Sequence, residues 1–334
     1  MVIDYSVIIR TTGKAGEKYR ALLDSIAHLA PQPKEVIVVL PEGYDLPVDR
    51  LGWETFYFCP KGMVIQRMTG IKKCRTAYAL ICDDDVKFGP DFVEKLYRPL
   101  AEGKYRLSAG PLYSFLPPKG ANALLCTLMS SAMPTVFHKK DRYVSVLKSS
   151  GYSYNRHLQP GRIYETQSVA WTCFFAEIAA IREIDFEAES WLDSHGYSAL
   201  DDQTMFYKAW LRGIRTAVVA DAYYEHMDAR TSRRGNRPEV TYSMGFNRVV
   251  FWHRFIYSMQ TTVLQKVLSR LAFAYFKAWV ELRAGLKMAF GRMKKEYNDL
   301  RKQAYQDAEQ FLSSAEYAAL PPVHGETAQD HTDG

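Results

Sequence analysis

The sequence lacks three features that mark other classes of protein. The N-terminus has no basic stretch followed by a long apolar run, so no signal peptide is predicted. No uninterrupted apolar run approaches the ~18 residues that a membrane-spanning helix needs. No two cysteines stand at CxxC spacing and their number is odd, which argues against a disulfide framework and a zinc knuckle: they are Cys59, Cys74, Cys82, Cys126 and Cys173. We therefore expect a protein of the reducing cytosol, soluble or held peripherally on the inner face of the cell membrane.

Nucleic-acid motifs and internal repeats are also missing. The 334 residues are 47% hydrophobic and 24% charged, which is typical of a folded globular protein. The formal net charge is +6, and the basic excess concentrates between residues 246 and 302, where the acids are Glu281, Glu296 and Asp299. A basic stretch without a nucleic-acid motif favours an anionic lipid surface as its partner, and no nucleic acid.

The first third of the chain alternates apolar strand-like runs with helix-like segments. This alternation predicts an α/β fold with a mostly parallel, Rossmann-like sheet covered by helices on both faces. Ligands of such sheets bind beyond the carboxyl ends of the strands, which places Arg10, Thr11, Glu42 and an aspartate triplet on one rim. The expected strands are 5–10, 35–40, 54–59 and 77–82, and the expected helices are 17–29, 63–75 and 91–101.

The remaining chain divides into a middle region and a helical region. Residues 112–164 are rich in Pro, Ser and Tyr without a steady period, and we expect loops and short helices there. Strand character returns at 168–177 and 216–220, with a helix at 200–212 between them. We predict a catalytic domain over 1–241, with a nucleotide-binding half to about 110 and an acceptor-side half from 111. A helical region over 242–320 and a disordered tail over 321–334 complete the chain.

The triplet Asp83, Asp84 and Asp85 directly follows the apolar run 77–82. Adjacent carboxylates repel one another, and a hard cation such as Mg²⁺ or Mn²⁺ offsets that repulsion. Alternate residues of an extended chain point the same way, so Asp83 and Asp85 are expected to face one site. The alternative is a solvated turn leading into the helix that begins near Pro90.

Two further features carry weaker signals on their own. Asp201 and Asp202 lead the helix 200–212, where one acid would suffice as an N-cap, and the second carboxylate is left to act. His226 follows the strand 216–220 on an expected loop, where a structural or merely exposed histidine is the ordinary alternative.

Taken in order, these segments resemble glycosyltransferase family two, the nucleotide-diphospho-sugar transferases of the GT-A fold. The resemblance covers about residues 4–228 and includes a strand like YSVIIRTTGK, a strand like EVIVVLPEG and a helix like GMVIQRMTG. It continues through a DxD motif at the end of 77–85, an acidic pair twelve residues before Gly213, and His226. Two positions depart from the family pattern. The second strand is followed by Pro-Glu-Gly in place of Asp-Asp-Gly-Ser, and the first acid of the pair is Asp201 where Glu is usual.

The resemblance implies a role for each matching residue. It places the donor nucleotide sugar near Arg10, Thr11, Glu42, Arg67, Asp83 and Asp84, and a divalent Mn²⁺ or Mg²⁺ on Asp85 and His226. Asp202 would be the catalytic base with Asp201 beside it, although the choice between these two stays open. Trp171 would form part of the acceptor wall.

The expected reaction is inverting sugar transfer from a nucleotide diphosphate to an acceptor hydroxyl, in polysaccharide or glycolipid synthesis at the cell surface. The metal would stabilise the leaving diphosphate as a Lewis acid, and the aspartate would take the proton of the attacking hydroxyl. Arg233 and Arg234 lie in a basic, turn-rich segment that is expected either to close over the diphosphate as a lid or to be a surface loop.

The C-terminal segment shows apolar residues at helical spacing, from Leu264 to Met293, with lysines and arginines on the other side. Such an amphipathic helix lies in a membrane interface, which would suit a lipid-linked acceptor, or it packs on its own domain or on a second subunit. Two alternatives to sugar transfer remain. A nucleotidyltransferase would use the TTGKAG loop, and a membrane-associated scaffold would need none of these aspartates.

Overall fold

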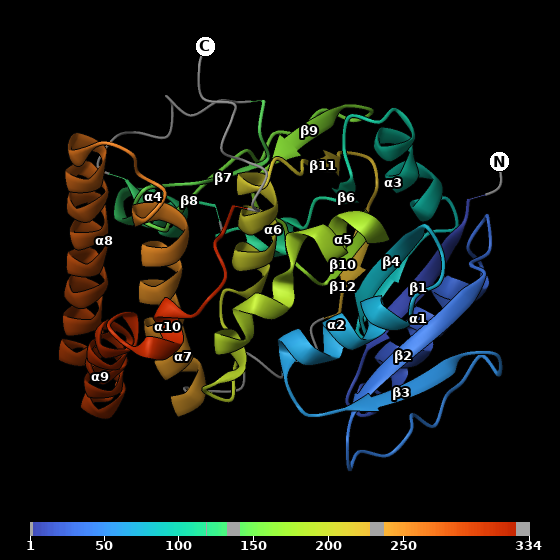
Figure 1. The fold of residues 1–334 in the computed structure, drawn as a ribbon, viewed down its shortest axis with the longest axis horizontal. Helices are drawn as coiled ribbons and strands as arrows, with labels where there is room; N and C mark the ends of the chain where they lie inside the picture. Colours follow the sequence, from blue (N-terminus) through green and yellow to red (C-terminus); the bar gives the residue numbers. More distant parts are fainter. Residues whose placement is uncertain (1–2, 118, 132–140, 228–236, 325–334) are drawn as a thin grey trace.

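The computed structural model describes residues 3–117, 119–131, 141–227 and 237–324 (Figure 1). An 8-stranded sheet forms the centre, in the order β3-β2-β1-β4-β10-β6-β11-β9. The strands in that order are β3 (Thr55–Cys59), β2 (Glu35–Pro41), β1 (Tyr5–Arg10), β4 (Tyr78–Asp83), β10 (Cys173–Glu177), β6 (Leu107–Ala109), β11 (Thr216–Val219) and β9 (Ile163–Thr166). The first four pair in parallel and β11 is parallel to β6, whereas β10 and β9 run antiparallel to their neighbours. The predicted mostly parallel α/β sheet is confirmed.

The central strands are apolar on both faces because helices cover both faces. In β1, Val7 and Ile9 face one buried cluster, which includes residues of α1 (Glu17–Ala27) and α3 (Phe92–Ala101). Ile8 faces the opposite cluster, which includes residues of α2 (Met63–Lys73), α5 (Ile178–Ile184) and α6 (Asp201–Leu211). This alternation follows from the two-residue period of a strand. It fixes the register of β1, so that Arg10 emerges at the carboxyl edge.

Two small strand pairs lie outside the main sheet. β5 (Val86–Phe88) pairs antiparallel with β12 (Tyr224–His226), and β7 (Val144–Val146) pairs with β8 (Tyr152–Tyr154). The middle region also holds a 3₁₀ turn, η1 (Tyr113–Phe115), and α4 (Ala121–Ser130). Loops and short helices were expected over 112–164, and the structure adds β7, β8 and the start of β9 to them. These strands are too short to give a periodic signal in the sequence.

The C-terminal helices stand on the side of the molecule away from β1, β2 and β3 (Figure 1). They are α7 (Pro238–Phe251), a π-helical segment η4 (Trp252–Tyr257), α8 (Val263–Ala289), α9 (Lys295–Leu312) and α10 (Ala315–Ala318). A buried ion cluster joins them to the 3₁₀ segment η3 (Phe186–Asp193) and α6, next to the central sheet. Glu189 of η3 binds Lys208 of α6 at 2.7 Å and Arg254 of η4 at 2.8 Å. Removing one partner from this buried cluster would leave an uncompensated charge, so the cluster couples η4 to η3 and α6.

The first residues of the expected tail are held against the body. Arg254 donates to the carbonyl of Pro321 at 2.7 Å, Arg212 donates to the carbonyl of Val323 at 2.7 Å, and the Val323 side chain is buried. Two arginines, one directly after α6 and one in η4, therefore hold residues 321–323 in place. Among the described helices, none combines the length and the apolar character needed to cross a bilayer.

Candidate active site

A cleft with a volume of about 440 Å³ opens at the carboxyl ends of β1 and β4. It gathers ten of the residues singled out from the sequence, which come from distant parts of the chain. Glu42, after β2, is exposed and is not among the residues that line the cleft. Arg233 and Arg234 lie outside the described residues. The ten are Arg10, Thr11, Arg67, Asp83, Asp84, Asp85, Trp171, Asp201, Asp202 and His226.

Asp83 is held by an arginine of the neighbouring strand. Arg10 and Asp83 are register partners on the parallel strands β1 and β4, so their side chains meet at the sheet edge. The Arg10 guanidinium donates to Asp83 Oδ1 through Nη2 at 3.1 Å and through Nε at 3.3 Å. Arg67 Nη2 lies 3.6 Å from the same oxygen. Asp83 is thus an oriented, compensated carboxylate.

Asp84 is held by the loop that follows β1. Burial raises the pKa of Asp84 to about 6, although a hydrogen bond donated by Thr11 Oγ1 at 2.5 Å opposes that rise. Thr11 also accepts the backbone N–H of Gly13 at 2.9 Å. Since Gly13 has a positive φ of 73° and a Cβ there would lie 2.5 Å from the carbonyl oxygen of Asp45, this loop requires glycine. The loop after β1 therefore fixes Thr11 against Asp84.

Asp85 and His226 are brought together by the β5–β12 pair. His226 is the register partner of Val86, and the backbone N–H of Met227 donates to the carbonyl of Asp85 at 2.8 Å. This pairing places His226 Nε2 3.2 Å from Asp85 Oδ1. The His226 ring also contacts Phe115, with ring centroids 5.5 Å apart.

This pair fits two adjacent ligands of a divalent cation. The 3.2 Å between His226 Nε2 and Asp85 Oδ1 brings an imidazole and a carboxylate to one point of the cleft, where both could contact one cation. Within the part of the chain that the structure describes, no group of three or more His, Cys, Asp or Glu side chains could hold a metal ion by itself. Such cations commonly take one or two protein ligands and complete their shell with substrate phosphates and water. Asp85 and His226 fit that pattern.

Arg67 lies between the aspartate triplet after β4 and the Asp201–Asp202 pair of α6. Its guanidinium pairs with Asp201 and stacks on the Trp171 ring at 4.2 Å, and its side chain is 5% exposed. Asp193 orients the helix that carries it, because the Asp193 carboxylate accepts the backbone N–H groups of Met63 at 2.8 Å and Val64 at 3.0 Å. A carboxylate at the N-terminus of α2 satisfies helix donors and favours the helix dipole.

Asp202 occupies a different environment from its neighbour Asp201. Burial is the main cause that raises the pKa of Asp202 to about 7, and the Asp201 carboxylate adds to the rise. One oxygen of Asp202 accepts the backbone N–H of Gln203 at 2.6 Å, which orients the carboxyl group at the start of α6. Asp202 therefore exchanges its proton near neutrality, whereas Asp201 is paired with an arginine. This difference favours Asp202 as the group that moves a proton.

Several lining residues were not singled out as site residues from the sequence. Lys18, on the first turn of α1, donates to the carbonyl of Met227 at 2.9 Å and so ties the start of α1 to the end of β12. Lys14 lies in the TTGKAG loop that a nucleotidyltransferase would use, whereas the sequence gave no signal for Lys18. Tyr197 and Phe115 gave none, because their place in the cleft depends on long-range packing. The added residues are Thr12, Lys14, Ala15, Lys18, Met63, Phe115, Thr172, Tyr197 and Arg237.

Comparison with known proteins finds one family model and similar solved structures. The family model "Glycosyl transferase family 2" matches residues 57–142. The crystal structure of S. aureus TarS 1-349 is similar, with a TM-score of 0.50 and 16% identity, covering 92% of this chain and 80% of that chain. The TarS 1-349 structure in complex with UDP-GlcNAc is similar with the same score and identity, covering 92% and 81%. At this identity the likeness confirms the fold. No curated protein matches the sequence.

Proposed function

From a chain that belongs to glycosyltransferase family 2 and has the GT-A fold, we propose an inverting transferase that moves a sugar from a nucleotide diphosphate to an acceptor hydroxyl. The observation that carries the proposal is the meeting of three elements in one cleft. The Asp85–His226 pair, the arginine-held Asp83 and the buried Asp202 come from β4, β12 and α6 and all line the same 440 Å³ space.

The donor is proposed to lie between the loop after β1 and α2. Arg10, Lys14 and Lys18 line this side of the cleft and would offset diphosphate charge, while the Asp83 carboxylate would accept hydrogen bonds from ribose or sugar hydroxyls. Asp85 and His226 would hold Mn²⁺ or Mg²⁺, which when bound supplies Lewis-acid stabilisation of the diphosphate leaving group. The TarS structure holds UDP-GlcNAc, so a uridine diphosphate sugar is the first donor to test.

The proton of the acceptor hydroxyl is proposed to pass to Asp202. As the acceptor oxygen forms its bond to the anomeric carbon, the bond from that carbon to the diphosphate oxygen breaks, and the nucleoside diphosphate leaves. Attack in one step on the face opposite the leaving group inverts the anomeric centre. Positioned general bases contribute roughly 10²–10⁴-fold, and the most effective pKa lies near the working pH, as it does for Asp202.

The test is a panel of nucleotide sugars followed by a product assay. UDP-, GDP- and dTDP-sugars are added with and without Mn²⁺, and the unfolding temperature is measured, because a ligand of the native state raises it by mass action. We expect one nucleotide class to stabilise the protein, more strongly with Mn²⁺. Release of the nucleoside diphosphate supports sugar transfer, whereas release of pyrophosphate supports the nucleotidyltransferase. Absence of stabilisation by every nucleotide leaves only the scaffold.

A peripheral place on an anionic membrane, facing a lipid-linked or glycan acceptor, is proposed from α8. Phe273 and Phe276 pack inward, while Leu271 is 62% and Phe290 74% exposed. α4 extends this apolar surface, with Leu124 exposed beside α8. The acidic residue within α8 is Glu281, which pairs with Arg301 at 2.9 Å. The basic residues of α8 and its C-terminal flank are Lys266, Arg270, Lys277, Arg283, Lys287, Arg292, Lys294 and Lys295.

Charge favours lipid over a second copy of the chain on this surface. A symmetric pairing of two α8 helices would bring lysine and arginine against lysine and arginine, whereas anionic headgroups neutralise them. Flotation with phosphatidylglycerol vesicles is expected to recover the protein, and phosphatidylcholine vesicles to recover much less. Leu271→Glu combined with Leu282→Glu should abolish recovery. Equal recovery with both lipids, or a stable dimer in light scattering that the double variant breaks, would contradict the membrane proposal.

A further inference from the structure

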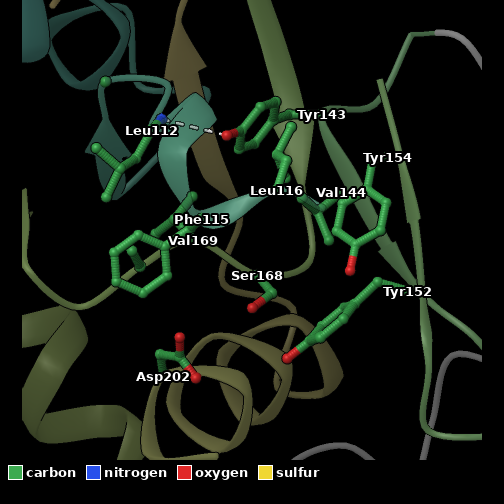
Figure 2. Close-up of a pocket in the computed structure, with 12 residues that line it drawn as sticks. Leu112, Phe115, Leu116, Tyr143, Val144, Tyr152, Tyr154, Ser168, Val169 and Asp202 are labelled. Atoms are coloured by element: carbon green, nitrogen blue, oxygen red, sulfur yellow. Dashed lines mark hydrogen bonds between the residues drawn. The ribbon is translucent and has the colours of Figure 1, made fainter. Parts of the chain in front are cut away.

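A second, smaller cavity lies beside the cleft and shares Phe115 and Asp202 with it. Its volume is about 80 Å³, and Figure 2 draws the side chains that line it. The other lining residues come from the segment after β6 that flanks η1, from β7 with the residue before it, from β8, and from the loop before β10: Gly110, Leu112, Leu116, Tyr143, Val144, Tyr152, Tyr154, Ser168, Val169 and Ala170. Most of the cavity wall therefore belongs to the middle region of the chain.

The walls of this cavity have two characters. Leu112, Leu116 and Val144 form an apolar side together with Val169, whereas the oxygens of Ser168, Tyr152 and Asp202 lie together at the opposite edge (Figure 2). An occupant must therefore be apolar at one end and able to form hydrogen bonds at the other.

The tyrosine oxygens at the edge have different hydrogen-bonding capacities. Burial holds the pKa of Tyr152 well above its usual range and raises the pKa of Tyr154 to about 12, so both phenols are neutral at physiological pH. Tyr152 donates its proton to Gln203 Oε1 at 2.7 Å, and its oxygen also interacts with the Ser168 hydroxyl, which leaves one lone pair for the cavity. The Tyr154 hydroxyl points into the cavity and can donate (Figure 2). The edge thus offers an acceptor at Tyr152 and a donor at Tyr154.

Size limits the occupant to a substituent of a few heavy atoms. An apolar cavity of ~150 Å³ takes benzene, and a single water needs ~15 Å³, so 80 Å³ falls between a water and a ring. A carboxylate would lie against the buried Asp202 among neutral phenols, which is costly. A methyl group would leave the phenol oxygens unpaired, and a hydroxymethyl group would leave the apolar wall without contact.

We propose that this cavity binds the acetamido group of an N-acetylated acceptor sugar. Resting on the proposed sugar transfer, this inference names the class of acceptor. The methyl group lies against Val144 and Leu116, the amide N–H donates to Tyr152, and the carbonyl accepts from Tyr154. The sugar ring then lies at the mouth shared with the cleft, with a ring hydroxyl at Asp202.

The test compares two acceptor probes on the full chain by saturation-transfer NMR: methyl N-acetyl-β-glucosaminide and methyl β-glucoside. Each is titrated with the best stabilising nucleotide among UDP, GDP and dTDP present. We expect the acetamido probe to bind about tenfold more tightly, because one well-placed small group in a pocket is worth roughly 10–200-fold. Equal binding of the two probes, or no binding of either, overturns the inference.

Two variants test whether the acetamido group binds in this cavity. Val144→Phe fills it and is expected to abolish the preference. Tyr154→Phe removes one oxygen, keeps the packing and should reduce the preference several-fold, so it decides the question if Val144→Phe does not fold. Tyr223→Phe, at an exposed tyrosine outside the cavity, is the matched control and keeps the full preference. Folded variants that retain the preference overturn the inference.

Nucleotide binding separates this inference from the proposed function. If a nucleotide stabilises the protein and its variants alike while the probes bind equally, the acetamido site alone is wrong. If no nucleotide stabilises the protein, the proposed sugar transfer itself is wrong.

Discussion

The cleft holds two acidic groups, one at the end of β4 and one at the start of α6. In both, the first aspartate pairs with an arginine and the second has a raised pKa, but the second aspartates face different spaces. At the end of β4, Arg10 holds Asp83 and burial raises the pKa of Asp84. At the start of α6, Arg67 pairs with Asp201 and burial raises the pKa of Asp202. In each group one carboxylate pairs with an arginine, and burial raises the pKa of the neighbouring carboxyl.

The two groups differ in the surroundings of the second aspartate, which is Asp84 after β4 and Asp202 in α6. Asp84 accepts a hydrogen bond from Thr11 within the donor side of the cleft, whereas Asp202 faces both the cleft and the aromatic cavity of Figure 2. A proton released in a reaction can reach Asp202 from a molecule bound in either space. The β4 group is thereby suited to hold the donor, and the α6 group is suited to proton transfer.

The largest expected effect comes from Asp202→Asn. An amide of the same size cannot accept the hydroxyl proton, so kcat should fall by roughly 10²–10⁴-fold while nucleotide affinity changes little. Initial rates of nucleoside diphosphate release and the thermal shift by nucleotide measure the two quantities. Asp24→Asn, at an exposed acid of α1, serves as the matched control and should retain full activity. An Asp202→Asn enzyme within twofold of the wild-type rate would contradict proton transfer at α6.

The second largest effect is expected on Mn²⁺ affinity, from a substitution of Asp85 after β4. Asp85→Ala removes the proposed anionic ligand, so we expect Mn²⁺ affinity to fall by at least the roughly 10–100-fold that loss of a group supporting a metal ligand costs. The Mn²⁺-dependent part of the stabilisation by a nucleotide sugar should then disappear at low metal concentration. Asp24→Ala should keep it. If Asp85→Ala leaves the Mn²⁺ titration unchanged, the β4 group does not hold the cation.

A tenfold effect is expected from pH, and it sharpens the contrast within the α6 pair. A general base must be unprotonated. Because the pKa of Asp202 is raised to about 7, kcat should fall by about tenfold for each pH unit below 7. Removing the neighbouring charge with Asp201→Asn should lower the pKa of Asp202 and move this limb of the kcat profile to lower pH. The charged groups that affect this titration are Asp201, Arg67 and Arg248. A limb that stays in place in Asp201→Asn, or that persists in Asp202→Asn, would assign it to another group.

Much of the N-terminal half could be predicted from the sequence because local pattern and tertiary environment agree there. β1 was predicted residue for residue, and the helix expected at 63–75 is α2 with its end two residues earlier. Buried parallel strands are continuous apolar runs, and the rule that ligands bind at their carboxyl ends needs no knowledge of side-chain packing. That rule was enough to bring Arg10, Thr11 and the aspartate triplet to one place.

Long-range pairing accounts for most of what could not be predicted. His226 meets Asp85 only through β5 and β12, each three residues long, and no periodic signal exists at that length. The aromatic cavity depends on β7, β8 and η1, which fall in the region expected to be mostly loops. The choice between Asp201 and Asp202 required the position of Arg67, which lies 134 residues away in the chain.

The smallest expected effect is on the free energy of unfolding. It tests how closely α2, the helix that carries Arg67, packs on the sheet. Gly70 is on the same helix and lies against the sheet, so that a Cβ there would lie 2.4 Å from Ile8 Cγ2 and 3.2 Å from Val39 Cγ2. These are branched core side chains with little room to move, so Gly70→Ala should push α2 outward and lower the free energy of unfolding by about 1–3 kcal/mol. Gly285→Ala is the matched control. It is an exposed helical glycine of α8 with no atom within 4 Å of the added Cβ, so helix propensity should raise the free energy of unfolding by up to about 1 kcal/mol. Denaturant unfolding of both variants measures the opposite signs. If Gly70→Ala is as stable as the wild type, close packing of α2 on the sheet does not set the position of Arg67.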